Sequence, residues 1–117
     1  MPGAPKILIP ITALPGALPG AAQWVSPFAV GVLGFHDIRM VSWTGIAAST
    51  LTIHIVPAGA AALPANAWQN ALVVAINTQG ERTYFERQFL LLPGYSIWAF
   101  AGAAAAVNLI INGTEYT

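Results

Sequence analysis

The stretch that most constrains the fold is the uncharged segment from Phe89 to Ile111, FLLLPGYSIWAFAGAAAAVNLII. It is long enough to cross a bilayer as a helix. Its residue order instead favours two strands, because Pro93-Gly94 is a turn dipeptide, Gly102 interrupts the apolar run, and β-branched residues follow from Val107. The choice between a membrane helix and a pair of strands decides the class of the whole chain.

The rest of the chain reads as short strands separated by proline, glycine and polar turns. The clearest strand runs from Thr50 to Val56, where aliphatic residues at 51, 53 and 55 alternate with polar residues at 50, 52 and 54, as in a strand with one buried face. Further strands are expected at Lys6–Thr12, Gln23–Ser26, Phe35–Trp43, the later half of Trp68–Ile76, Arg82–Phe89, Tyr95–Ala101 and Val107–Ile111.

This pattern of about eight strands, with turns every 8 to 12 residues or so, is typical of an all-β sandwich or barrel. We predict an all-β chain that folds as a single antiparallel β-sandwich of jelly-roll type. The C-terminal apolar stretch supplies two strands of this sandwich, because a lone spanning helix would leave the preceding strands without partners. A membrane association is therefore not expected, and a small membrane protein remains as an alternative.

The beginning of the chain is rich in proline. Six prolines lie in the first 30 residues, at positions 2, 5, 10, 15, 19 and 27, and they exclude a helix of useful length. They also interrupt the apolar run that a signal peptide would need. We predict an extended Pro/Gly-rich arm over residues 1–22 and a sandwich domain over residues 23–117. The apolar side chains of Leu14 and Leu18 indicate that the arm packs over its own domain or across a neighbouring subunit.

Charged residues are scarce in this chain. They make up 7% of its 117 residues, where roughly 25% is ordinary for a soluble domain. The net charge is zero, which gives no attraction for phosphate backbones or anionic lipids, so nucleic acid is not an expected partner. With 56% hydrophobic residues, a free monomer would expose much apolar surface. A permanent homo-oligomer explains this composition, because obligate interfaces are apolar and poor in charge.

No residue pattern indicates catalysis. The absence of cysteine removes disulfides, thiolate metal sites and cysteine nucleophiles. His36 and Asp37 are neighbours in a strand and point to opposite faces, so they are poorly placed as a base and its orienting acid. Asp37 is expected to pair with Arg39 instead. His36 and His54 lack a spaced metal motif, and we predict a non-enzymatic protein without metal or cofactor.

Aromatic residues give the strongest functional signal. If Ile97 faces the core, Trp98 and Phe100 point outward, and exposed large aromatics usually mark a contact site. The opposite interpretation is that both faces of this strand are buried. The charged pairs Glu81-Arg82 and Glu86-Arg87 either protect a strand edge or meet a neighbouring subunit. The predicted subunit contacts are Trp98, Phe100, Trp43, Arg82, Arg87, Leu14 and Leu18.

The order of motifs carries a resemblance. A short strand ends at Val25-Ser26-Pro27, a long one runs from Ile38 to Trp43, LTIHIVPAG follows at 51–59, LLLPGYSI at 90–97, and the last strand leads to Gly113 and Glu115. In this order residues 23–117 resemble small β-sandwich domains of tailed-bacteriophage structural proteins. The chain departs from them at Gly94-Tyr95, where Gly-Asp is usual, and in its surface aromatics.

The resemblance implies a component of the virion, located in the capsid decoration or in the tail, neck or fibre. Such a protein binds its own copies and other virion proteins. We favour capsid decoration, because a short single-domain chain with an adhesive arm suits many identical surface sites. The alternative is a host-receptor or glycan-binding module, in which an exposed tryptophan stacks on a sugar.

Overall fold

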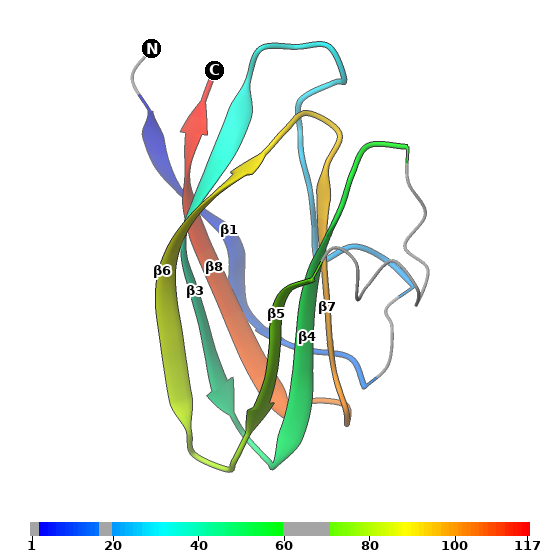
Figure 1. Ribbon diagram of the computed structural model, residues 1–117, viewed down its shortest axis with the longest axis vertical. Coiled ribbons are helices and arrows are strands. Elements are labelled where there is room, and N and C mark those ends of the chain that lie inside the picture. Colours follow the sequence, from blue (N-terminus) through cyan, green and yellow to red (C-terminus); the bar gives the residue numbers. More distant parts are fainter. Residues whose placement is uncertain (1–2, 17–19, 60–70) are drawn as a thin grey trace.

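The computed structural model describes residues 3–16, 20–59 and 71–117, of which residues 71, 72, 77 and 84–88 are described by their backbone only. Within these ranges the fold is all-β, with two four-stranded antiparallel sheets that form two layers (Figure 1). Sheet A has the order β1-β8-β3-β6, with β1 (Ala4–Ala13), β3 (Phe35–Gly45), β6 (Arg82–Leu91) and β8 (Val107–Tyr116). Sheet B has the order β2-β7-β4-β5, with β2 (Trp24–Val25), β4 (Ser49–Val56), β5 (Ala71–Asn77) and β7 (Ser96–Ala101).

The apolar stretch from Phe89 to Ile111 forms strands, as its turn residues predicted. It completes β6, forms β7 and begins β8. Between β6 and β7 the Tyr95 amide donates a hydrogen bond to the Leu92 carbonyl, at 3.1 Å, and Gly94 has a φ of 81°. A type II turn requires a positive φ at its third residue, which glycine supplies, and proline is common at the second. No helix in the described ranges is long and apolar enough to span a membrane.

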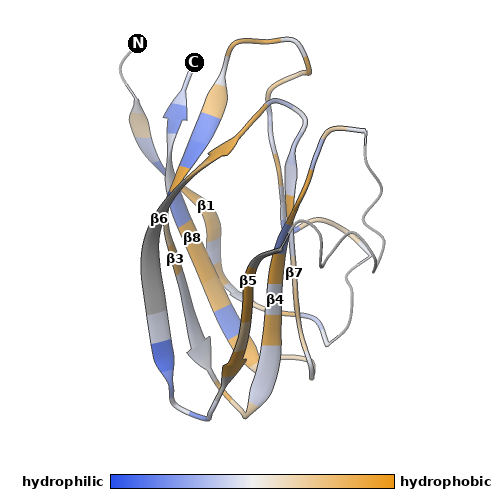
Figure 2. Cartoon of the chain, in the orientation of Figure 1, coloured by the Kyte–Doolittle hydropathy of each residue, from blue (hydrophilic) through white to orange (hydrophobic). Residues whose placement is uncertain are grey.

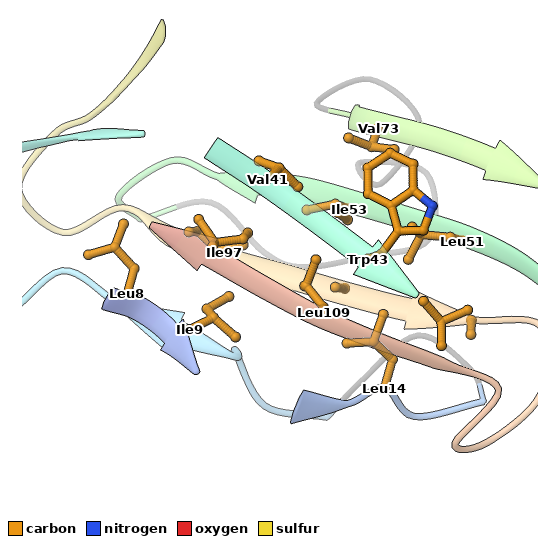
Figure 3. Packing of buried hydrophobic residues seen from close by; sticks show 14 of the residues in the cluster. Leu8, Ile9, Leu14, Val41, Trp43, Leu51, Ile53, Val73, Ile97 and Leu109 are labelled. Atoms are coloured by element: carbon orange, nitrogen blue, oxygen red, sulfur yellow. The ribbon is translucent and has the colours of Figure 1, made fainter. Parts of the chain in front are cut away.

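The hydrophobic core lies between the two sheets. Leu51, Ile53 and Ile55 of β4 are at most 4% exposed, which confirms the inward face predicted from their alternation. Thr52 and His54 are also at most 4% exposed, so the expectation that only one face of this strand is buried was wrong. Ile97 and Ala99 of β7 lie in the same core. Figure 3 shows how side chains from the strands of both sheets gather in this single cluster. Because each fully buried aliphatic side chain contributes about 1.5 to 3 kcal/mol, this cluster is the main source of stability.

The N-terminal residues belong to sheet A. The predicted strand Lys6–Thr12 lies inside β1, which pairs with β8 from Ala4 opposite Glu115 to Ala13 opposite Asn108. Its prolines are tolerated because β1 is an edge strand, where one side of the backbone needs no ladder partner. Leu8, Ile9 and Leu14 are at most 6% exposed in the core. Residues 4–14 therefore contribute a strand and core side chains to the same fold as the residues that follow.

The chain then crosses from sheet A to sheet B along residues 14–16. The Leu14 amide donates to the Val107 carbonyl at 3.0 Å, and the Leu14 carbonyl accepts from the Ala105 amide at 3.0 Å. The Pro15 carbonyl accepts from the Ala101 amide at 2.8 Å. These bonds hold the segment against the ends of β7 and β8 in its own chain. Leu18 lies outside the described residues.

Candidate interaction surface on sheet B

The face of sheet B that points away from the core is formed by alternate residues of three neighbouring strands. Ile53 and Ala99 are fully buried in the core, so the residues next to them in sequence project to the opposite side of the sheet. The register places Phe100, Thr52 and Val74 in one row across β7, β4 and β5. We call the following set the outer face: Thr50, Thr52, His54, Val74, Ile76, Trp98 and Phe100.

The outer face carries no charged side chain, and its most exposed members on β5 are aliphatic. Val74 is 58% exposed and Ile76 is 81% exposed, while Trp98 and Phe100 are half-buried. None of its seven members is an aspartate, glutamate, lysine or arginine. In Figure 2 the hydrophobic colour follows β5 over most of its described part. An uncharged surface with exposed aliphatic side chains gains free energy when another apolar surface covers it.

The aromatic side chains of the outer face contact one another. The Trp98 Nε1 donates a hydrogen bond to the Ser96 Oγ at 2.8 Å, which satisfies the one polar atom of the indole. The ring centroids of Trp98 and His54 are 6.4 Å apart, and the two ring planes are inclined to each other by 26°. The Phe100 ring meets the His54 ring edge to face at 6.3 Å. These distances are within the range of attractive aromatic pairs, so the three rings hold one another in place.

His54 lies beneath these rings without a polar partner. Its side chain is fully buried, and among the described residues neither ring nitrogen has a hydrogen-bond partner. Burial lowers the pKa of His54 below its ordinary value of 6.5, because desolvation penalises the imidazolium. The imidazole is therefore held in its neutral form, as one more flat, largely apolar ring in the layer.

The buried imidazole gives a testable pH dependence. Above pH 6.5 His54 is neutral in the folded and the unfolded chain. As the pH falls below this value, the unfolded chain binds a proton that the folded chain does not, so stability decreases by up to about 1.4 kcal/mol per pH unit. We expect His54→Leu to remove this slope between pH 6.5 and 5, measured by urea unfolding at one protein concentration.

The remaining members of the outer face contain no titratable group, so within this face the slope arises from His54, and the difference between wild type and His54→Leu isolates its contribution. Acid destabilisation through Glu115 begins at lower pH, because that carboxyl has a lowered pKa and loses its stabilising charge only below about pH 4.5. The assignment of the slope to His54 is contradicted if wild type and His54→Leu lose the same amount of stability between pH 6.5 and 5.

A second candidate site is a polar cluster, which lies where β1, β8 and β3 meet near the chain termini. The Glu115 Oε2 is 2.8 Å from His36 Nε2 and accepts a hydrogen bond from Lys6 Nζ at 2.9 Å. These hydrogen bonds, first that of Lys6 and then that of His36, lower the pKa of the Glu115 carboxyl. Asp37 pairs with Arg39 at 3.0 Å, which confirms the predicted ion pair.

The geometry of this cluster is that of a structural contact. His36 is 1% exposed, and its ring contacts those of Trp24 and Phe28, with centroids 4.9 Å and 5.2 Å away. Glu115 joins it to Lys6, so the three side chains tie three adjacent strands of sheet A together. Among the described residues no group of three or more histidine or acidic side chains is arranged to hold a metal ion.

The structure places the other predicted contact residues apart from the outer face. Leu14 lies in the core. Trp43 is 5% exposed in the core as well, because β3 continues to Gly45 and Trp43 shares the inward face with Val41. Arg82 is exposed on sheet A, beside a shallow depression of about 360 Å³ that Ile11 also lines. The side chain of Arg87 lies outside the described part of the chain.

Val74 and Ile76 were missing from the residues predicted from sequence. The segment that contains them, WQNALVVAI, mixes helix-favouring and strand-favouring residues, so its pattern did not show which residues would face outward. The only available signal was the pair of β-branched residues at 74 and 76 with Ala75 between them, a period of two. No protein-family model, curated protein or solved structure matches this chain.

Proposed function

We propose that this chain is a non-enzymatic structural protein of a bacteriophage virion, which self-assembles and binds the particle surface. The observation that carries the proposal is the outer face of sheet B, with its exposed Val74 and Ile76, its two half-buried aromatics and no charge. Apolar faces of this kind mark contact sites. Covering them stabilises an assembly by about 25 cal/mol for each Å² of apolar surface removed from water.

The strand order supports a finer proposal for the fold. In sheet A the first strand pairs with the last, and in sheet B the second pairs with the seventh, β7. Such nested pairing is the arrangement of a jelly roll, which combines two Greek keys in two sheets. Jelly rolls are common in viral capsid proteins. The resemblance of residues 23–117 to phage structural proteins leaves the position in the virion open, and this analogy of fold favours the capsid decoration over the tail, neck or fibre.

Trp98 supports a second candidate function. Its indole is half-buried and is oriented by the hydrogen bond to Ser96, and the jelly-roll architecture also occurs in lectins. A fixed aromatic ring at a surface is suited to stacking on a sugar. The chain would then be a host-receptor or glycan-binding module rather than a purely structural protein.

The composition of purified particles tests the proposal. We expect mass spectrometry of virions, purified from the phage that encodes the chain, to find it in many copies relative to the capsid protein. Its absence from particles contradicts the virion role. A second experiment measures binding of the isolated chain to host-surface polysaccharide. Binding that Trp98→Ala abolishes, while the oligomeric mass of the variant equals that of wild type, would assign the chain to the glycan-binding class.

A further inference from the structure

We infer that two copies of this chain pair edge to edge through β5. The inference rests on the proposed self-assembly and specifies one contact within it. In the described part of the chain each sheet ends in two edge strands, so β1, β6, β2 and β5 each carry one row of backbone N–H and C=O groups outside the ladders of their sheet. Such rows are templates for pairing with another strand, and proteins usually block them.

Three of these edges carry a device that blocks pairing. β1 contains Pro5, Lys6 and Pro10, and its register with β8 shifts twice around Ile9. β2 has only two residues, too few for a new ladder. The sequence of β6, RTYFERQFLL, carries charged residues at 82, 86 and 87. Proline, bulges, short length and charge are the usual means by which an edge strand is protected.

β5 has no charge and no proline. Its seven residues, ALVVAIN, are all uncharged, and the chain contains no aspartate, glutamate, lysine or arginine from residue 40 to residue 80. Its pairing with β4 is regular from Val73 to Asn77, and the one register shift lies before Val73. Val74 and Ile76 are 58% and 81% exposed on the outer face. This is the combination that makes a strand edge adhesive.

The occupant that fits this edge is the β5 of a second copy. A row of backbone donors and acceptors is satisfied by an extended strand, and a two-fold axis brings the same strand from each copy together in antiparallel orientation. Because β5 carries no charge, no like charges meet across the axis. The two sheets B then join into one continuous sheet, and Val74 and Ile76 of both copies pack side by side on its outer face.

A matched pair of lysine variants tests the contact. Ile76 on β5 and Ile11 on β1 are both highly exposed, at 81% and 75%, so both substitutions are compatible with the fold. Lysine on an edge strand opposes pairing. By sedimentation equilibrium we expect Ile76→Lys to weaken dimerisation by about tenfold or more, since two like charges would be brought close together on the paired strands. Ile11→Lys should keep the wild-type mass.

Single cysteines provide an independent readout. The chain has no cysteine, so a disulfide formed by Val74→Cys can only join two chains. We expect a covalent dimer with Val74→Cys under mild oxidation, and much less of it with Ile11→Cys. An oligomeric wild type whose mass is unchanged by Ile76→Lys, with no preferential crosslink at position 74, overturns the β5 contact but leaves the proposed self-assembly intact. A monomeric wild type overturns both.

Discussion

A chain that lacks residues 1–13 is expected to lose its cooperative fold. The deletion removes β1, the ladder partner of β8, together with the core side chains Leu8 and Ile9. Burial of these two side chains alone contributes about 3 to 6 kcal/mol. Most domains have a net stability of about 5 to 15 kcal/mol, and the lost ladder adds to the deficit. The near-ultraviolet circular dichroism of the truncated chain should be flat, and its urea unfolding should lack a sharp transition.

The matched control removes only Met1 and Pro2, which precede β1. This shorter deletion should unfold as the full chain does. A truncation of residues 1–13 that keeps native near-ultraviolet circular dichroism and a sharp transition would show that β1 is an accessory arm. It would also place the source of stability entirely in the remaining strands.

The second large effect is expected for Ile53→Ala. Ile53 is fully buried in β4, between β5 and β7, and its side chain lies in the cluster formed by both sheets (Figure 3). Truncation of a buried isoleucine removes transfer free energy and leaves a cavity, which together cost about 2 to 5 kcal/mol. Urea unfolding at one fixed protein concentration measures this loss, because the apparent stability of an oligomer depends on concentration.

Ile11→Ala is the control for this substitution. Ile11 is 75% exposed, so the same change in side chain should alter the free energy of unfolding by no more than about 0.5 kcal/mol. A loss below about 1 kcal/mol for Ile53→Ala would contradict the inward orientation of that face.

Local patterns in the sequence predicted much of the fold. The alternation over residues 50–56 identified β4 and its inward face. The turn residues Pro93-Gly94 indicated that the long apolar stretch forms strands and not a membrane-spanning helix. Both features are local, since they depend on the period of side chains along one strand or on the φ angles of two residues. The expected positions of β3, β6, β7 and β8 follow from the same type of signal.

The features that the sequence did not reveal depend on contacts between distant residues. Proline in β1 suggested a separate arm, because only the sheet order shows that β1 is an edge strand where proline is tolerated. His36 and Glu115 are 79 residues apart and meet through the register of β3 and β8. The exposure of Val74 and Ile76 depends on the position of β5 at the edge of sheet B. Periodicity along a strand carries no information about its neighbours.

The mass of the wild-type chain in solution tests the central claim, that an uncharged outer face and an unprotected β5 edge make this a self-assembling protein. Sedimentation equilibrium at micromolar concentration should give at least twice the 12.2 kDa of one chain. A single species of 12.2 kDa under these conditions would contradict the claim.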